Sequence, residues 1–118
     1  MIFVKFQPAS LDSAGRMEAS GHAGAEHGER GWNVLCAAFT ALLGAMSSNL
    51  EKIDDDDLEI QSKADDGYAE ISWKRQSGKN GSGISGANSV AEYTYTAIAK
   101  LAECYPGEIK AVWEEVST

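Results

Sequence analysis

Residues 16–51, RMEASGHAGAEHGERGWNVLCAAFTALLGAMSSNLE, change their hydrophobic period partway along the stretch. Apolar and polar positions alternate in residues 16–22, which is typical of a strand with one buried face. Beyond residue 33, apolar positions recur every three or four residues, which is typical of an amphipathic helix. Residues 23–32, between the two patterns, are rich in glycine. The stretch therefore predicts a strand that ends at His22, a glycine-rich loop, and a helix over about residues 33–51.

The residues before this stretch supply a partner for the predicted strand. Apolar side chains alternate again in IFVKF, residues 2–6, and PASLDSAG, residues 8–15, has the composition of a turn. Two neighbouring strands joined by a short turn predict an antiparallel hairpin. Its predicted buried face comprises Ile2, Val4, Phe6, Met17 and Ala19.

The second half of the chain repeats the arrangement of two strands and a helix. Residues 57–62 and 67–75 alternate around KADDG, a turn signal at residues 63–67, and residues 76–88 read as a loop. A second helix follows and stops at YPGE, residues 105–108, before a last strand in IKAVWEE. The predicted packing face of this helix comprises Val90, Tyr93, Ala97, Leu101 and Cys104.

The predicted element order is β-β-α-β-β-α-β. Two helices and several hairpin-linked strands favour an α+β fold, a two-layer α/β sandwich with two helices packed on a mixed, largely antiparallel sheet. The chain has 118 residues, which fits one domain over residues 1–118.

Composition and charge narrow the class of protein. The net charge of −8 argues against direct binding of nucleic acid and favours a basic partner. No apolar stretch is long enough to span a bilayer, and the N-terminal residues lack the pattern of a signal peptide, so we expect no membrane association. Two cysteines without a secretion signal are typical of reduced thiols, which predicts a cytoplasmic protein.

Residues 51–70 hold nine of the eighteen carboxylates. A solvated turn beside a hairpin is one interpretation of this acidic segment. A divalent metal site at Asp54–Asp57 is the other, although their spacing does not match a calcium loop.

Cys36 lies in the first turn of the predicted helix, where the positive end of the helix dipole favours a thiolate. His22 ends the strand that the glycine-rich loop connects to this helix, so its imidazole is a candidate base for the thiol proton. Cys36 as a small buried side chain and His22 as an ordinary surface residue remain alternatives. A zinc site would comprise His22, His27, Cys36 and Cys104, in a spacing that matches no common zinc motif.

The stretch GHAGAEHGERGWNVLCAAFTALLGAM, residues 21–46, resembles the ribosomal-processing cysteine protease family. That family has a Gly-His-Ala motif closing its second strand, then a glycine-containing loop, then a helix that begins near Asp-Ile-Val-Cys-Ala-Ala. The likeness continues more loosely in MIFV at the start of the chain and in LAECYPGEIK, residues 101–110.

The resemblance implies two helices against a sheet, a homodimer, and a cytosolic cysteine endopeptidase that needs no cofactor or metal. It implies a basic ribosomal protein as partner and substrate, with removal of an N-terminal extension from ribosomal protein number twenty-seven of the large subunit after paired aromatic residues. By position, His22 is the expected general base and Cys36 the expected nucleophile. The expected supporting residues are Gly21, Ala23, Gly24, Gly28, Gly31 and Asn33. The expected substrate-binding residues are Trp32, Ala37 and Thr40.

Asn33 stands where the family usually has aspartate, and the span from His22 to Cys36 is longer than the family pattern. Asn33 can cap the helix but offers no negative charge to an imidazolium. These departures motivate a second hypothesis, a non-catalytic protein that binds ribosomal protein or assists ribosome assembly on the same scaffold. Thr40 replaces a common serine and either lines the site or packs the helix.

Overall fold

The computed structural model describes residues 1–22, 34–53 and 57–115. The described residues form β1 (Ile2–Gln7), β2 (Gly15–Gly21), α1 (Val34–Glu51), β3 (Leu58–Asp65), β4 (Tyr68–Arg75), α2 (Ile84–Cys104) and β5 (Ile109–Trp113). This order of elements is the predicted one.

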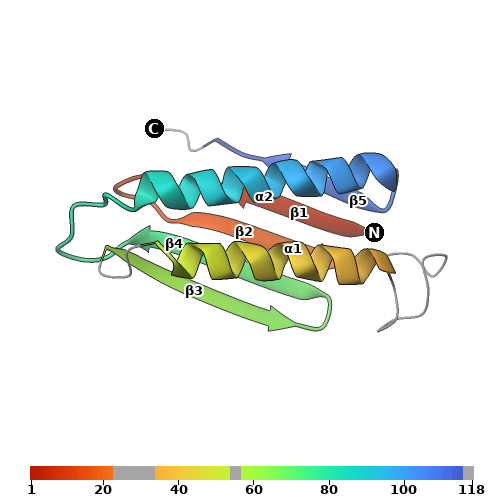
Figure 1. Cartoon of the computed structure of the whole chain (residues 1–118), viewed down its shortest axis with the longest axis horizontal. Coiled ribbons are helices and arrows are strands. Elements are labelled where there is room, and N and C mark those ends of the chain that lie inside the picture. The colour runs from red at the N-terminus through yellow and green to blue at the C-terminus, as the bar shows by residue number, and fades with distance from the viewer. Residues whose placement is uncertain (23–33, 54–56, 116–118) are drawn as a thin grey trace.

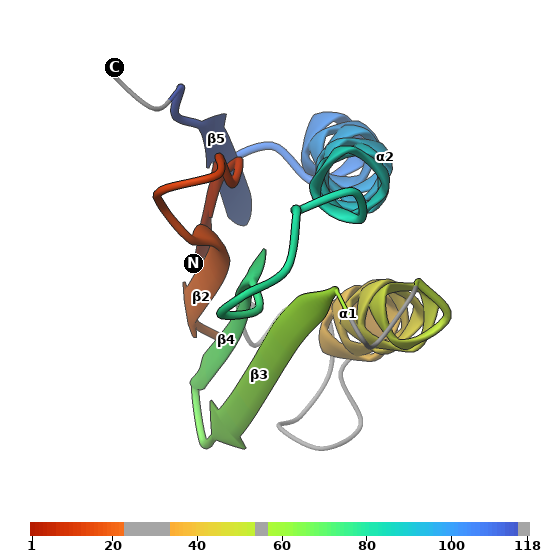
Figure 2. The same ribbon diagram turned by 90° about the vertical axis from the view of Figure 1, so that its left-hand side faces the viewer.

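The strands form one mixed sheet in the order β3-β4-β2-β1-β5. β1 and β5 are parallel, whereas the other neighbouring pairs are antiparallel. Both helices cover the same face of the sheet (Figure 2). They run side by side in opposite directions (Figure 1). The predicted α+β sandwich of two layers is confirmed.

The core lies between the sheet and the helices. All five side chains of the predicted hairpin face are buried, and α1 contributes Leu35, Phe39, Met46 and Leu50. Full burial of a large apolar side chain stabilises the fold by about 1.5–3 kcal/mol relative to exposure. The apolar side chains that alternate in β1 and β2, and those that recur with the helical period in α1, are therefore the ones that pack in the core, as the sequence predicted.

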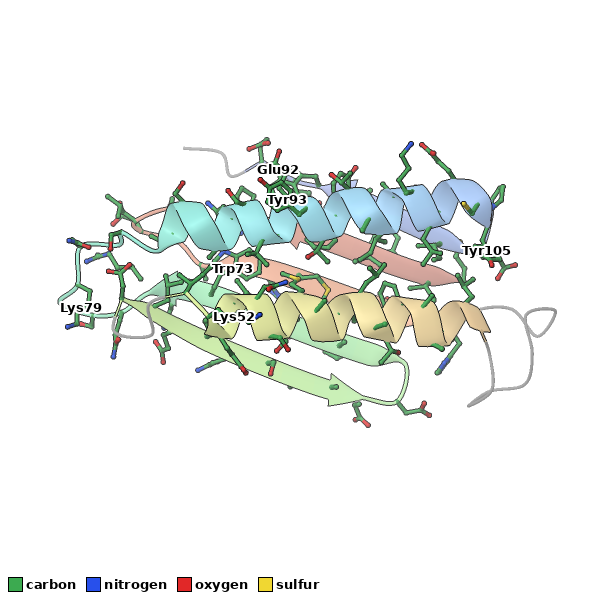
Figure 3. The ribbon with its side chains drawn as sticks, in the orientation of Figure 1. Lys52, Trp73, Lys79, Glu92, Tyr93 and Tyr105 are labelled. Atoms are coloured by element: carbon green, nitrogen blue, oxygen red, sulfur yellow. The ribbon has the colours of Figure 1, made fainter. Side chains whose placement is uncertain are left out.

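Among the described residues, Trp73 is the largest fully buried side chain (Figure 3), and it connects three segments. Its ring lies over Gly15 of the neighbouring strand, where an added Cβ would stand 2.2 Å from Trp73 Cε2. Trp73 Nε1 donates to Asn88 Oδ1 at 2.9 Å. Asn88 Oδ1 also accepts from the Ala9 N–H at 2.8 Å, and Asn88 Nδ2 donates to the Ala9 carbonyl at 2.9 Å. This partly buried amide therefore connects β4, α2 and the turn after β1.

The predicted turn at residues 63–67 is too long. β3 continues through Lys63 to Asp65, because Lys63 pairs with Glu70 and Asp65 with Tyr68. Cross-strand pairing thus overrides the polar composition of this segment. The turn itself is Asp66–Gly67, and Gly67 has a φ of +72°, which favours glycine.

α2 begins at Ile84, inside the predicted loop. The carboxylate of Asp57 accepts hydrogen bonds from the Gly81 N–H, at 3.0 Å, and from the Gly83 N–H. A carboxylate at this end of a helix pairs N–H groups and complements the helix dipole. Asp57 is 4% exposed, so its prediction as part of a solvated turn is wrong. Residues 54–56, the rest of that acidic run, lie outside the described residues.

The predicted packing face of α2 is correct only in part, because Val90 and Leu101 are partly buried against the core whereas Tyr93 and Cys104 are exposed. The buried face comprises Ile84, Ala87, Ala91, Thr94 and Ile98. Tyr93, which is labelled in Figure 3, is 75% exposed. Cys104 is exposed as well. The face with small side chains packs inward, because Ala87 and Ala91 allow the helix backbone to approach the rest of the core closely.

Candidate active site

The backbone at His22 is held where β2 ends. Gly21 has a φ of +99°, and an added Cβ there would stand 2.0 Å from the Met1 carbonyl oxygen. The Gly21 N–H donates to the Gly67 carbonyl at 2.9 Å, and the Met1 amino group donates to the His22 carbonyl at 2.8 Å. Glycine is therefore required at position 21, and the strand end is bonded to two other segments.

The imidazole of His22 lies against the β3–β4 turn. Its Nε2 is 3.7 Å from Asp66 Oδ1, within ion-pair distance when the ring is protonated. An added Cβ on Gly67 would stand 2.8 Å from the same nitrogen, so the ring passes close to the turn backbone. The side chains of His22 and Asp66 are 44% and 68% exposed. The pair is therefore solvated, and its electrostatic strength is that of a surface pair.

Cys36 is the third residue of α1 and carries a partly buried thiol that forms no disulfide with a described residue. The positive end of the helix dipole lies at this first turn, which contains no acidic side chain. A helix start lowers the free energy of a thiolate relative to a thiol. This position favours a reactive cysteine.

A groove of about 490 Å³ is lined by both His22 and Cys36. Its wall along α1 comprises Phe39, Thr40, Leu43, Gly44 and Ser47. Other apolar lining comes from Ile2, Ala19, Ala69 and Ile71. The β3–β4 hairpin closes one side with Lys63, Ala64 and Asp65. The start of α1, the end of β2 and the β3–β4 turn lie at one end of the molecule (Figure 1). The arrangement can receive an extended chain beside a thiol and an imidazole.

The strand residues near the groove form a polar network. Tyr68 Oη donates to Glu70 Oε2 at 2.6 Å, and Arg16 Nε lies 3.4 Å from Glu70 Oε1. The hydrogen bond from Tyr68 and the attraction of Arg16 and Lys63 lower the pKa of Glu70 below its ordinary value. The bond to Glu70 in turn raises the pKa of Tyr68. Glu70 therefore stays ionised beside the groove at neutral pH.

The predicted residues fall into three sets. Gly21, His22, Cys36 and Thr40 line the groove. Ala37 is exposed on α1 and is not among the lining residues. The third set lies outside the described residues and comprises Ala23, Gly24, Gly28, Gly31, Trp32 and Asn33.

Asp66 and Gly67 were not predicted at the site. The sequence marks them as a turn, but nothing local places that turn beside His22, since the two lie on different strand connections. The groove-lining residues Leu43, Gly44 and Ser47 were also missed. Their signal was their helical spacing of three, four and seven residues from Thr40, on the face of α1 that continues from Cys36.

Within the described ranges, no three His, Cys, Asp or Glu side chains are grouped as metal ligands. The three described members of the alternative zinc set, His22, Cys36 and Cys104, therefore do not form such a group, while His27 lies outside the described residues. Neither α1 nor α2 is long and apolar enough to cross a membrane.

Solved structures of low sequence identity share this fold. The ribosomal processing protease Prp from S. aureus, in complex with a covalently linked product peptide, aligns with a TM-score of 0.69 at 20% identity, covering 97% of this chain and 100% of that one. The same protease with a substrate peptide aligns with a TM-score of 0.67 at 18% identity and the same coverage. SMU.848 from Streptococcus mutans aligns with a TM-score of 0.64 at 24% identity, covering 98% of this chain and 99% of that one.

No curated protein matches the chain. The family model described as Cysteine protease Prp matches residues 1–110, which include both the strand end with His22 and the helix start with Cys36. With a fold shared by Prp structures and a family match over nearly its whole length, this chain belongs to the cysteine protease family Prp.

Proposed function

We propose that this protease removes the N-terminal extension of ribosomal protein number twenty-seven of the large subunit, using Cys36 as nucleophile and His22 as general base. The observation that carries the proposal is that the thiol and the imidazole line one groove. Family membership supplies the class of reaction, since the family is one of cysteine proteases.

The first half of the proposed reaction forms an acyl-enzyme. His22 accepts the proton of the Cys36 thiol, and the thiolate attacks the carbonyl carbon of the scissile peptide bond. The start of α1 stabilises both the thiolate and the oxyanion that develops on the carbonyl oxygen, with backbone N–H groups of the first turn as the proposed donors. The imidazolium then gives its proton to the leaving amine as the C–N bond breaks.

The second half releases the extension. A water molecule gives one proton to His22 and attacks the thioester carbon, the C–S bond breaks, and the proton returns to the cysteine sulfur. The chain therefore ends each cycle with a thiol and a neutral imidazole. No metal or other cofactor enters these steps.

The groove and the charge of the chain support a basic, aromatic substrate. Phe39, Leu43 and Ile71 give the groove apolar surface that suits the aromatic residues expected before the cleavage site. The net charge of −8 speeds the encounter with a basic ribosomal protein. The S. aureus protease described above holds a substrate peptide, which supports peptide binding on this fold.

Mass spectrometry of ribosomal protein number twenty-seven carrying an N-terminal extension tests this function. We expect the wild type to shorten the protein, and Cys36→Ala and His22→Ala to leave its mass unchanged. Cys104→Ala is the matched control, because Cys104 is exposed and does not line the groove, and it should cleave like the wild type. Cleavage by Cys36→Ala at the wild-type rate would refute the assignment of the nucleophile.

The same mass measurement distinguishes the protease from the second hypothesis, a non-catalytic binding protein. A non-catalytic binding protein would retain the ribosomal protein on an affinity column and leave its mass unchanged. We further expect a homodimer, which light scattering after gel filtration tests, and a cytoplasmic location, which cell fractionation tests.

A further inference from the structure

We propose that Asp66 is a positioning residue for His22 and that the imidazole packs against the Asp66–Gly67 turn. The inference deepens the proposed function, because it takes His22 as the base for Cys36. Its basis is the 3.7 Å separation of His22 Nε2 from Asp66 Oδ1. In cysteine and serine proteases, an acidic or amide side chain on the far ring nitrogen commonly fixes the histidine that acts as base.

The turn is attached to the strand that carries His22. The Gly67 carbonyl accepts from the Gly21 N–H at 2.9 Å, next to His22 in the chain. On the other side, Asp65 pairs with Tyr68 and closes the hairpin. Hydrogen bonds of the residues on either side thus hold the backbone of the Asp66 turn beside the end of β2.

Gly67 leaves space for the imidazole beside the turn. Its φ of +72° favours glycine, and an added Cβ would stand 2.8 Å from His22 Nε2. The absence of a side chain lets the imidazole approach the turn backbone. The turn therefore provides both the space that the His22 ring occupies and the carboxylate that lies beside it.

The proposal gives the two ring nitrogens of His22 different roles. Nε2 carries its proton toward the Asp66 carboxylate, which leaves Nδ1 to accept the proton of the Cys36 thiol. Proton transfer produces a thiolate and an imidazolium, and Asp66 pairs with the positive ring. Asp66 itself neither gains nor loses a proton.

Other charged groups lie near His22, so the test must distinguish the effect of Asp66 from the effects of these groups. The Met1 amino group donates to the His22 carbonyl. Among the described residues, the remaining titratable groups that line the groove are Cys36, Lys63, Asp65, Tyr68 and Glu70. Because Asp66 is 68% exposed, we expect an effect on rate of about twofold to fivefold, as for an exposed ion pair.

The rate of Cys36 alkylation by iodoacetamide tests the proposal without a peptide substrate. All variants carry Cys104→Ser, since the exposed Cys104 would otherwise react. Asp66→Asn removes the charge but keeps an Asn-Gly pair, which is favourable in a tight turn. Asp66→Glu restores the charge. Asp12→Asn, in the exposed turn after β1 and outside the groove, is the control for the same change of net charge.

We expect Asp66→Asn to slow alkylation about twofold to fivefold at neutral pH, Asp66→Glu to recover most of the rate, and Asp12→Asn to match the parent. The gap between parent and Asp66→Asn should shrink in 0.5 M salt, roughly the range in which exposed charges are screened. Equal rates for Asp66→Asn and Asp12→Asn would overturn the proposal. Unchanged alkylation in His22→Ala would also overturn it, because His22 would then not activate the thiol.

Peptide cleavage distinguishes this proposal from the function on which it rests. If the ribosomal protein is cut, Asp66→Asn should lower kcat by the same factor and leave KM unchanged, since Asp66 acts through His22. If the ribosomal protein is not cut but alkylation follows the expected pattern, the substrate assignment fails and the role of Asp66 stands.

Discussion

Replacement of the buried Asp57 by alanine should lower the free energy of unfolding more than neutralising any of the exposed acids of β3. Asp57 is 4% exposed and accepts from the N–H groups of Gly81 and Gly83 at the start of α2. A hydrogen bond to a charged group contributes about 1.5–3 kcal/mol, and loss of a helix cap costs about 0.5–2 kcal/mol. Because these two descriptions overlap, we expect a total loss of about 3 kcal/mol for Asp57→Ala.

This loss should be visible as a shift in melting temperature. An unfolding entropy of about 2.1 cal/mol/K per residue gives about 0.25 kcal/mol/K for this chain. A loss of about 3 kcal/mol therefore lowers Tm by about 12 °C. Asp57→Asn keeps one acceptor oxygen but turns an amide donor toward the other N–H, so it should lose roughly half as much.

Urea unfolding followed by tryptophan fluorescence gives the free energy directly. Glu59→Gln is the matched control, because Glu59 is exposed on the neighbouring strand and pairs with Lys74 at 3.3 Å. An exposed pair contributes about 0.2–1 kcal/mol. If Asp57→Ala and Glu59→Gln have the same free energy of unfolding, Asp57 does not hold the start of α2 and our explanation of that helix boundary is wrong.

Three further predictions concern packing and pH. Gly15→Ala should destabilise the fold by about 1–3 kcal/mol in urea, since its Cβ would overlap the buried Trp73 ring, and a stability equal to wild type would contradict this packing. Gly44→Ala should raise the free energy of unfolding by about 0.5–1 kcal/mol, because an added Cβ meets nothing within 4 Å in a helix interior, and a loss of stability would count against it. Glu70 has a lowered pKa in the folded chain, chiefly from the Tyr68 hydrogen bond, so its contribution is present above about pH 4.5 and is lost as pH falls through the lower folded value. Thermal melts of Glu70→Gln should therefore depend less steeply on pH in this acid range than those of wild type, and parallel curves would contradict the assignment.

The sequence predicted the order of elements and most of their boundaries. The alternation of Ile2, Val4 and Phe6 and the helical spacing of Leu35 and Phe39 arise from neighbours in the chain, so they are legible without a structure. The first turn of α1 likewise marked Cys36 as a candidate nucleophile, since the helix dipole depends only on where the helix begins.

The errors share one cause. The predicted packing face of α2 included Tyr93 and Cys104, which are exposed, and missed Ala87 and Ala91, which are buried. Large side chains favoured the first stripe, whereas the space between helix and sheet admits the second. The sheet and α1 determine the size of that space, so it cannot be predicted from the sequence of α2 alone.

For this chain, the sequence by itself determined the layers and the order of strands and helices along the chain, and it was the source of the proposal that His22 and Cys36 carry the thiol chemistry. Tertiary structure alone decided that Asp66 lies beside His22, that Asp57 caps α2, and that one groove joins the end of β2 to the start of α1. Periodicity and capping are local, because they depend on residues a few positions apart. Contacts between His22 and Asp66, or between Asp57 and Gly81, join distant segments, and they exist only after the sheet has paired and the helices have packed on it.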